Sequence, residues 1–201
     1  MNIEQCIKTR RSIRQFENGS LSKKEIEEIL SLAILAPAPH HTKPWRFVVA
    51  NQEKRINLAD AMGAKWRIDL LKDGFKESII LELLRKSKER IIAAPTLIVG
   101  CIDTSSLRHY DDVSKDDHEM IMSHHSFGAA LQNILLIANQ RNLAAYWISS
   151  PLYAPLQVQK VLSYPNTWKS VAAIAIGYPK TNFDPPKRQQ IPIDDFIFWT
   201  P

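Results

Sequence analysis

The stretch TLIVGCI, residues 96–102, is a continuous run of mostly apolar residues that follows directly after Pro95. A strand with one face in water alternates polar and apolar residues, whereas a strand covered on both faces is apolar throughout. The run therefore predicts a strand in a sheet that is covered on both faces. The segment before it, residues 75–95, has the apolar spacing of a long amphipathic helix.

The helix expected after this strand is the longest in the chain. It covers HEMIMSHHSFGAALQNILLIANQRN, residues 118–142, and Asp116 or Asp117 can cap it. Its ILLIA portion, residues 134–138, is apolar nearly all round, which is typical of a helix buried in the core or at a subunit contact. The polar segment before it, residues 108–119, predicts a mobile loop.

Further helices and strands extend the pattern toward both ends of the chain. Ser22 and Glu25 have the spacing of a capping box, and Pro37 stops the helix that follows them. The other expected helices cover residues 53–62 and 154–162, whereas KWRIDLL at residues 65–71 is ambiguous. Further strands are expected at residues 46–50, 144–149 and 170–178. We therefore expect one α+β domain over residues 1–201, with a central mixed sheet flanked by helices and an extended C-terminal arm.

Composition and charge exclude several classes of protein. The chain is 45% hydrophobic, and no run of about 18 apolar residues predicts a membrane span. The first twelve residues lack an apolar signal-peptide core, so we expect a cytoplasmic protein. A net charge of +5 is only mildly basic, and no nucleic-acid-binding module accompanies it. Cys6 and Cys101 are too few for a disulfide framework.

Several common catalytic motifs are missing from the sequence. The six glycines lie too far apart for a dinucleotide-binding fingerprint or a P-loop, and no G-x-S-x-G elbow occurs. The six histidines include no H-E-x-x-H pair, so ordinary polar or capping roles are expected and no metal site is predicted.

The segment KTRRSIR, residues 8–14, carries four cations and no acid. Arg10, Ser12 and Arg14 alternate, so an extended backbone would direct them to one side. Two guanidiniums and a hydroxyl form a donor set suited to a phosphate monoester, and the pair Lys187–Arg188 could approach the same anion. The alternative is a solvated N-terminal run of charge.

Five motifs now follow one another in a recognisable order. They are RRSIR at 10–14, APAPHHTKPWRF at 36–47, GAALQNILLIA at 128–138, AAYWISS at 144–150 and AIAIGYP at 173–179, with the basic pair after them. In this order and spacing the whole chain resembles the nitroreductase family of FMN-dependent oxidoreductases. The resemblance implies a nitroreductase-like fold and a homodimer that binds FMN at the subunit interface.

The resemblance also assigns expected roles to residues. Arg10, Arg11, Ser12 and Arg14 match positions that hold the phosphate and ribityl chain, and Lys187 and Arg188 match basic residues that reach the same phosphate. The loop that runs beside flavin N5 is matched by Trp147, Ile148, Ser149 and Ser150. On this reading hydride passes from NAD(P)H through flavin N5 to a nitroaromatic or quinone-like acceptor, and no side chain acts as nucleophile. For the last four residues the alternative is a plain strand end with polar residues.

The turn at residues 36–45 departs from the usual family pattern A-P-S-x-x-N-x-Q-P-W. Ala38 stands in place of Ser, His41 in place of Asn and Lys43 in place of Gln. We expect His40, His41 and Lys43 to face the flavin or its substrate. The variant turn resembles the reductase domain of the deazaflavin coenzyme γ-glutamyl ligase, which implies an FMNH2-dependent reduction of a dehydro precursor as an alternative function. A flavin-binding protein without turnover is the alternative of another class.

Overall fold

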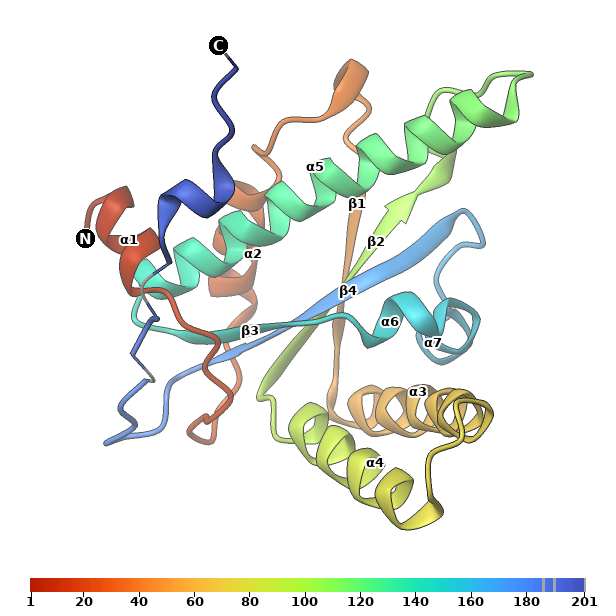
Figure 1. The fold of residues 1–201 in the computed structure, drawn as a ribbon. Helices are drawn as coiled ribbons and strands as arrows, with labels where there is room; N and C mark the ends of the chain where they lie inside the picture. Colours follow the sequence, from red (N-terminus) through yellow and green to blue (C-terminus); the bar gives the residue numbers. More distant parts are fainter. Residues whose placement is uncertain (186, 190, 201) are drawn as a thin grey trace.

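The central sheet is antiparallel at every pairing between its strands. The computed structural model describes residues 1–185, 187–189 and 191–200. Within these residues the sheet has four strands in the order β1-β2-β4-β3 (Figure 1). The strands are β1 (Trp45–Ala50), β2 (Thr96–Asp103), β3 (Ala144–Ile148) and β4 (Trp168–Gly177).

The α+β class is confirmed, but the expectation of a mixed sheet is wrong for the described strands. Helix α5 (Val113–Gln140) is a single crossover from β2 to β3, so these two strands run in the same direction. They are not neighbours, because β4 lies between them and is antiparallel to both. Two helices, α3 (Gln52–Lys72) and α4 (Glu77–Ile92), connect β1 to β2 and return the chain in the opposite direction.

Helices cover both faces of the sheet, as the apolar run at residues 96–102 predicts. All eight residues of β2 are buried. Ile98 and Ile102 pack in one core with α2 (Lys23–Ala33) and α5, whereas Leu97, Val99 and Cys101 pack in a second core. The second core is covered by α3, α4, α6 (Ser150–Tyr153) and α7 (Pro155–Leu162). Figure 1 shows α5 along one face and α3 and α4 on the other.

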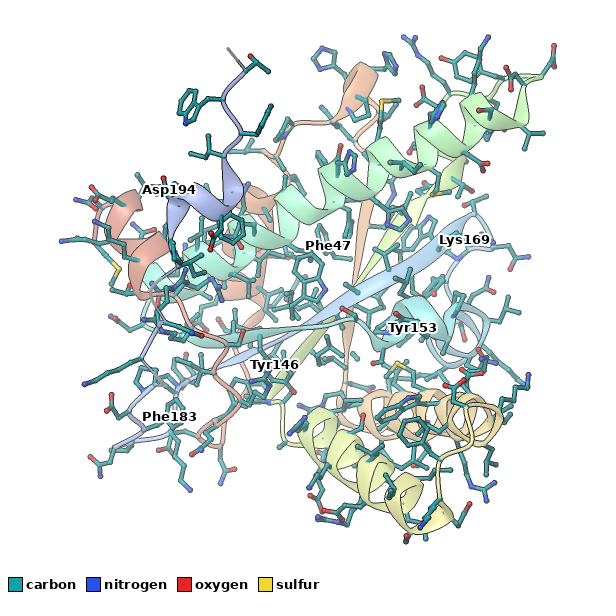
Figure 2. The ribbon with its side chains drawn as sticks, in the orientation of Figure 1. Phe47, Tyr146, Tyr153, Lys169, Phe183 and Asp194 are labelled. Carbon is teal, nitrogen blue, oxygen red and sulfur yellow. The ribbon has the colours of Figure 1, made fainter. Side chains whose placement is uncertain are left out.

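A glycine in β2 allows α5 to approach the sheet closely. A Cβ atom added to Gly100 would lie 2.0 Å from Cζ of Phe127, which belongs to α5. The Phe127 ring also lies 5.9 Å from the ring of Phe47 on β1. Figure 2 labels Phe47, which lies beneath α5. This side of the sheet is therefore a closed core without room for a ligand at this point.

The ends of the helices agree in part with the sequence. Ser22 and Glu25 form the predicted capping box, in which the Ser22 hydroxyl accepts from the Glu25 amide and the Glu25 carboxylate accepts from the Ser22 amide. The N-cap of α5 is Asp112, because its carboxylate accepts from the Ser114 amide at 2.9 Å. The predicted cap at Asp116 or Asp117 is wrong, and part of the expected loop is helical. The ambiguous residues 65–71 continue α3.

The two ends of the chain add elements outside the sheet. Helix α1 (Ile3–Thr9), which was not expected from the sequence, packs against α5. The described residues after β4 include the short helix η3 (Ile193–Phe196), and Phe198 and Trp199 are 88% and 82% exposed. Residues 186, 190 and 201 of the expected arm lie outside the described residues. Among the helices described, none combines the length and the apolar character that crossing a bilayer requires.

Candidate functional site

Residues 10–16 pass the outer edge of β3 at Ile13 and reach the end of β4, where Phe16 pairs with Pro179. The Ile13 amide donates to the Ala145 carbonyl at 3.1 Å, so this segment is joined to the free edge of the strand. Arg14 lies over the ring of Tyr146 at 5.2 Å, and the Phe16 ring stacks on the same ring at 6.1 Å. The extended segment expected from the alternation of Arg10, Ser12 and Arg14 is therefore fixed beside the residues of the AAYWISS motif.

A cluster of cations forms at the start of this segment. Arg188 donates from Nη2 to the Arg10 carbonyl at 3.2 Å, so the structure brings together two basic sites that are far apart in sequence. Burial lowers the pKa of Arg10, and the positive charges of Arg188 and Arg11 lower it further. Within the described residues no carboxylate forms an ion pair with Arg10. This crowding of positive charge favours a bound anion.

The other predicted residues of the anion site are exposed or are engaged by the backbone. Ser12 is exposed between Arg10 and Arg14, and Lys187 is exposed beside Arg188. Arg11 donates from Nη1 to the carbonyls of Lys8 and Arg10, so part of its guanidinium is engaged by the backbone.

A cavity of about 590 Å³ opens between β3 and the helix pair α3 and α4. Four of the predicted residues line it: Arg14, Trp147, Ile148 and Ser150. Ser149 lies at the N-cap of α6, where its carbonyl accepts from the Leu152 amide at 3.0 Å. The cavity is large enough for a flat organic cofactor, and residues 10–14 connect it to the cation cluster.

Most of the remaining wall was not predicted from the sequence. Figure 2 shows Tyr146 on β3 and Tyr153 on α6, both on the side of the sheet that faces α3 and α4. The helices contribute Met62, Gly63, Lys65, Trp66 and Asp69 from α3 and Leu83, Lys86, Ser87, Arg90 and Ile91 from α4, while Asp73 follows α3 and Ala154 follows α6. The sequence contained one sign of this wall: in the ambiguous segment KWRIDLL, Trp66 lies on the polar side of a helix, where it is 37% exposed.

Two guanidiniums provide the unpaired positive charge of the cavity. Tyr146 is 4% exposed and donates from its hydroxyl to the Arg90 carbonyl at 2.9 Å. Burial raises the pKa of Tyr146 to about 12, although the charges of Arg14 and Arg90 oppose the shift. In the described part of the chain neither arginine has an ion-pair partner, whereas the cavity lysines pair with Asp69 and Glu82. The cavity therefore suits an electron-rich or anionic group.

The turn that contains His40, His41 and Lys43 lies elsewhere. It includes the short helix η1 (Pro39–His41) and leads into β1, the edge strand opposite β3. None of its residues lines the cavity of the same chain. His40, His41 and Lys43 are all exposed, and His40 Nε2 also lies 3.4 Å from Glu119 Oε1 on α5. One chain alone therefore does not bring these predicted residues to the others.

The backbone of this turn is unusual. His40, His41 and Lys43 have φ angles of 53°, 56° and 48°, in a region that residues with a side chain rarely adopt. Such strain persists where the surrounding structure fixes it, and it often occurs at ligand-binding sites. As for metals, no group of three or more His, Cys, Asp or Glu side chains in the described residues could hold an ion.

Comparisons with known proteins show the family of this chain. The model of the nitroreductase family matches residues 7–178, which include the cavity walls and Arg10 but not the basic pair at 187–188. A protein of Methanothermobacter thermautotrophicus named "Putative NADH dehydrogenase/NAD(P)H nitroreductase" is 29% identical over 196 residues, covering 92% of this chain and 84% of its own. The iodotyrosine deiodinase of Hydra vulgaris is 28% identical over 204 residues, covering 94% of this chain and 69% of its own.

A solved structure gives the same result for the fold. It is described as a putative nitroreductase in complex with FMN from Desulfovibrio desulfuricans, and it is 22% identical to this chain. It superposes with a TM-score of 0.73 and covers 100% of this chain and 98% of its own. At this identity the likeness shows that the two proteins share a fold.

Proposed function

The chain belongs to the nitroreductase family, and from this we propose that it is an FMN-dependent oxidoreductase that uses NAD(P)H to reduce a small conjugated acceptor. The observation that carries the proposal is the link between two features that FMN needs. Residues 10–14 lead from the cations at Arg10 and Arg188 directly to the cavity at Arg14. A phosphate and a flat ring system, joined by a short chain, match this arrangement.

The residues present fit FMN in their chemistry. Arg10 and Arg188, with Lys187 and Ser12 beside them, would hold the phosphate, because an anion would offset both the burial and the neighbouring positive charges that lower the pKa of Arg10. Arg14, Trp147, Ile148 and Ser150 would border the ring system. When bound, FMN supplies the capacity to accept hydride from a nicotinamide and to pass it on.

The side chains of the cavity would then orient and stabilise rather than react. Arg14 and Arg90 place positive charge where an electron-rich ring would gain negative charge on reduction. Trp66, Trp147 and Tyr153 provide apolar surface that excludes water from part of the cavity. The absence of a dinucleotide fingerprint in the sequence suits a nicotinamide donor that binds only transiently.

We also propose that the protein is a homodimer in which the turn of one subunit completes the cavity of the other. Two observations support this. The turn lies at the opposite edge of the sheet from the cavity, so it serves no site in its own chain. Apolar surface is available for association: a groove of about 290 Å³ between α1, α2 and α5 is lined by Met1, Ile3, Leu32, Leu136 and Ile137, among others.

The experiment that tests the function starts with the absorbance spectrum of the purified full-length protein. We expect a yellow protein with about one FMN released per subunit, and anaerobic titration with NADH and with NADPH should bleach the flavin. A colourless protein that fails to bind added FMN would overturn the proposal. A flavin that neither nicotinamide reduces would favour the non-catalytic flavin-binding protein.

The acceptor has two further candidates, each with its own supporting observation. The deiodinase relative favours a halogenated phenol. The exposed His41 and Lys43 favour the phosphate- and carboxylate-bearing dehydro precursor of the deazaflavin coenzyme, if they reach the partner's cavity. Rates with a nitroaromatic, a quinone, an iodophenol and that precursor, measured side by side, would rank them. We expect the nitroaromatic or quinone to be reduced fastest.

A further inference from the structure

A buried carboxylate lies beneath the strained turn. Glu119 on α5 is only 2% exposed. Its Oε1 atom lies 3.4 Å from His40 Nε2 and 3.4 Å from the Tyr110 hydroxyl, which are both long contacts. Its Oε2 atom is buried and has no hydrogen-bond partner. Across the described residues, no lysine or arginine forms an ion pair with it.

This arrangement is costly and contributes little to the core. A buried carboxylate with one unpartnered oxygen is less stable than an apolar residue of similar volume. Further along α5 the helix packs on the sheet through apolar residues, since Phe127, Ala130 and Leu131 are buried in the core. A buried polar group in such a position needs an explanation, and the structure provides one in the turn above it.

The base of the turn is held by other contacts. The Thr42 amide and hydroxyl both donate to the Pro39 carbonyl, at 3.1 and 3.0 Å. Arg46 donates to the Lys43 carbonyl at 3.0 Å and pairs with Asp103 at 2.9 Å. These contacts fix where the turn begins and ends. Among the described residues, the one ion-pair contact to a side chain at the tip, where the left-handed backbone begins, is that between Glu119 and His40.

We infer that Glu119 is a positioning residue, which holds His40 so that the left-handed turn presents His41 and Lys43 to the flavin site of a second copy of this chain. The inference rests on the proposed function, because it assigns Glu119 to a site that two subunits form. His40 is itself 35% exposed at the side chain, so its contact with Glu119 fixes one side of the ring, while the side chains of His41 and Lys43 extend into solvent beside it. Pre-organising them in this way reduces the cost of ordering them when FMN binds.

The first test measures FMN affinity separately from stability. Glu119→Ala and His40→Ala should each weaken FMN binding by about tenfold, because loss of the His40–Glu119 contact frees the turn that presents His41 and Lys43. Glu119→Gln, which keeps the size and one acceptor, should recover part of this loss. The double variant Glu119→Ala/His40→Ala should bind no more weakly than either single one, because both remove the same contact. Fluorescence titration gives the affinity, and thermal unfolding shows that each variant is folded.

The control is Asp117→Asn, which neutralises an exposed carboxylate on the same helix two residues away. It should bind FMN as the wild type does. If Glu119→Ala and Glu119→Gln also bind FMN as the wild type does, the inference is overturned while the proposed function stands. If the wild type itself binds no FMN, the proposed function fails first, so the two failures are distinguishable.

The second test asks whether the turn acts on the partner subunit. Arg10→Ala and Glu119→Ala damage different walls of a site, so a dimer with one subunit of each kind has one site with both defects and one intact site. At an FMN concentration where neither parent binds, purified mixed dimers should recover binding at one of the two sites. If mixed dimers bind no more FMN than the parents, the inference is overturned, because Glu119 would then act within its own chain.

Discussion

The two edges of the sheet place residues for one proposed site by opposite physical means. At the β3 edge the backbone of residues 10–14 is extended and hydrogen-bonded through Ile13, while the charges of Arg10 and Arg188 are crowded. At the β1 edge the backbone at His40, His41 and Lys43 is strained, while a carboxylate is buried below it. Each edge therefore contains one unfavourable feature: crowded positive charge at the β3 edge, and a strained turn above a buried carboxylate at the β1 edge. A ligand or a partner subunit can relieve each of them.

The largest expected effect is at the β3 edge. Arg10→Ala should weaken FMN binding by about 1.5–3 kcal/mol, the usual value for a hydrogen bond to a charged group. Folding stability should change little, because the variant also relieves repulsion with Arg188. Fluorescence titration and urea unfolding measure the two quantities. The control is Arg85→Ala on α4, where the arginine pairs with Glu82 and Glu89 at the surface; equal losses of FMN affinity in both variants would contradict the prediction.

A second effect at the β3 edge depends on pH. The pKa of Tyr146 is raised to about 12, so folding favours the neutral phenol. This contribution is fully present below the ordinary tyrosine pKa of about 10 and is lost as the pH rises to about 12, by roughly 2.7 kcal/mol for this group alone. At neutral pH the free energy of unfolding of Tyr146→Phe should be about 1 kcal/mol below that of the wild type, because the hydrogen bond to the Arg90 carbonyl is gone. Between neutral and high pH, however, the variant should lose less unfolding free energy than the wild type.

Urea unfolding at pH 8 and pH 11 measures this difference. Cys101 and Tyr164 also have raised pKa values because they are buried, so the variant should keep some alkaline sensitivity. If Tyr146→Phe and the wild type lose the same free energy of unfolding between the two pH values, the neutral phenol is not what stabilises this edge.

The β1 edge predicts the opposite balance between stability and binding. Lys43→Gly places glycine at a φ of 48°, where it is unstrained, so stability should rise by up to about 1 kcal/mol. FMN or acceptor binding should weaken, because the amine and the fixed direction of the turn are lost. Asn142→Gly is the matched control, since Asn142 has a φ of 56° after α5 and lies outside the cavity wall. Asn142→Gly should change stability without changing FMN affinity. If Lys43→Gly also leaves FMN and acceptor binding unchanged, the turn has no part in the site.

The two edges also differ in how far the sequence could predict them. Alternation in RRSIR is a local pattern, so the extended segment was accessible, whereas the approach of Arg188 to Arg10 was expected from the shared need of both basic sites for one anion. The apolar run at residues 96–102 likewise predicted a strand buried on both faces. Strand order depends on which strands pair across long connections, so the insertion of β4 between β2 and β3 was not accessible.

The turn and the helix pair show a second kind of limit. Three left-handed residues without glycine contradict local preference, so no sequence pattern predicts them. The burial of Glu119 follows from the packing of the turn on α5, which is a tertiary effect. The cavity wall from α3 and α4 was missed because its residues are spaced as on any amphipathic helix, and only the exposed Trp66 stands out.

The smallest expected effects separate the two residues of the basic pair. Arg188 contacts the Arg10 carbonyl, whereas Lys187 is exposed and forms no hydrogen bond or ion pair with the described residues. Arg188→Ala should therefore weaken FMN binding clearly, and Lys187→Ala by only about 0.5 kcal/mol, as is usual for an exposed charge. The loss of FMN affinity in Lys187→Ala should vanish at high salt, because salt screens the attraction between exposed charges that are not in direct contact. The loss in Arg188→Ala should persist in part. Titrations of both variants at low and high salt test this, and equal, salt-independent losses would show that Lys187 also contacts the phosphate directly.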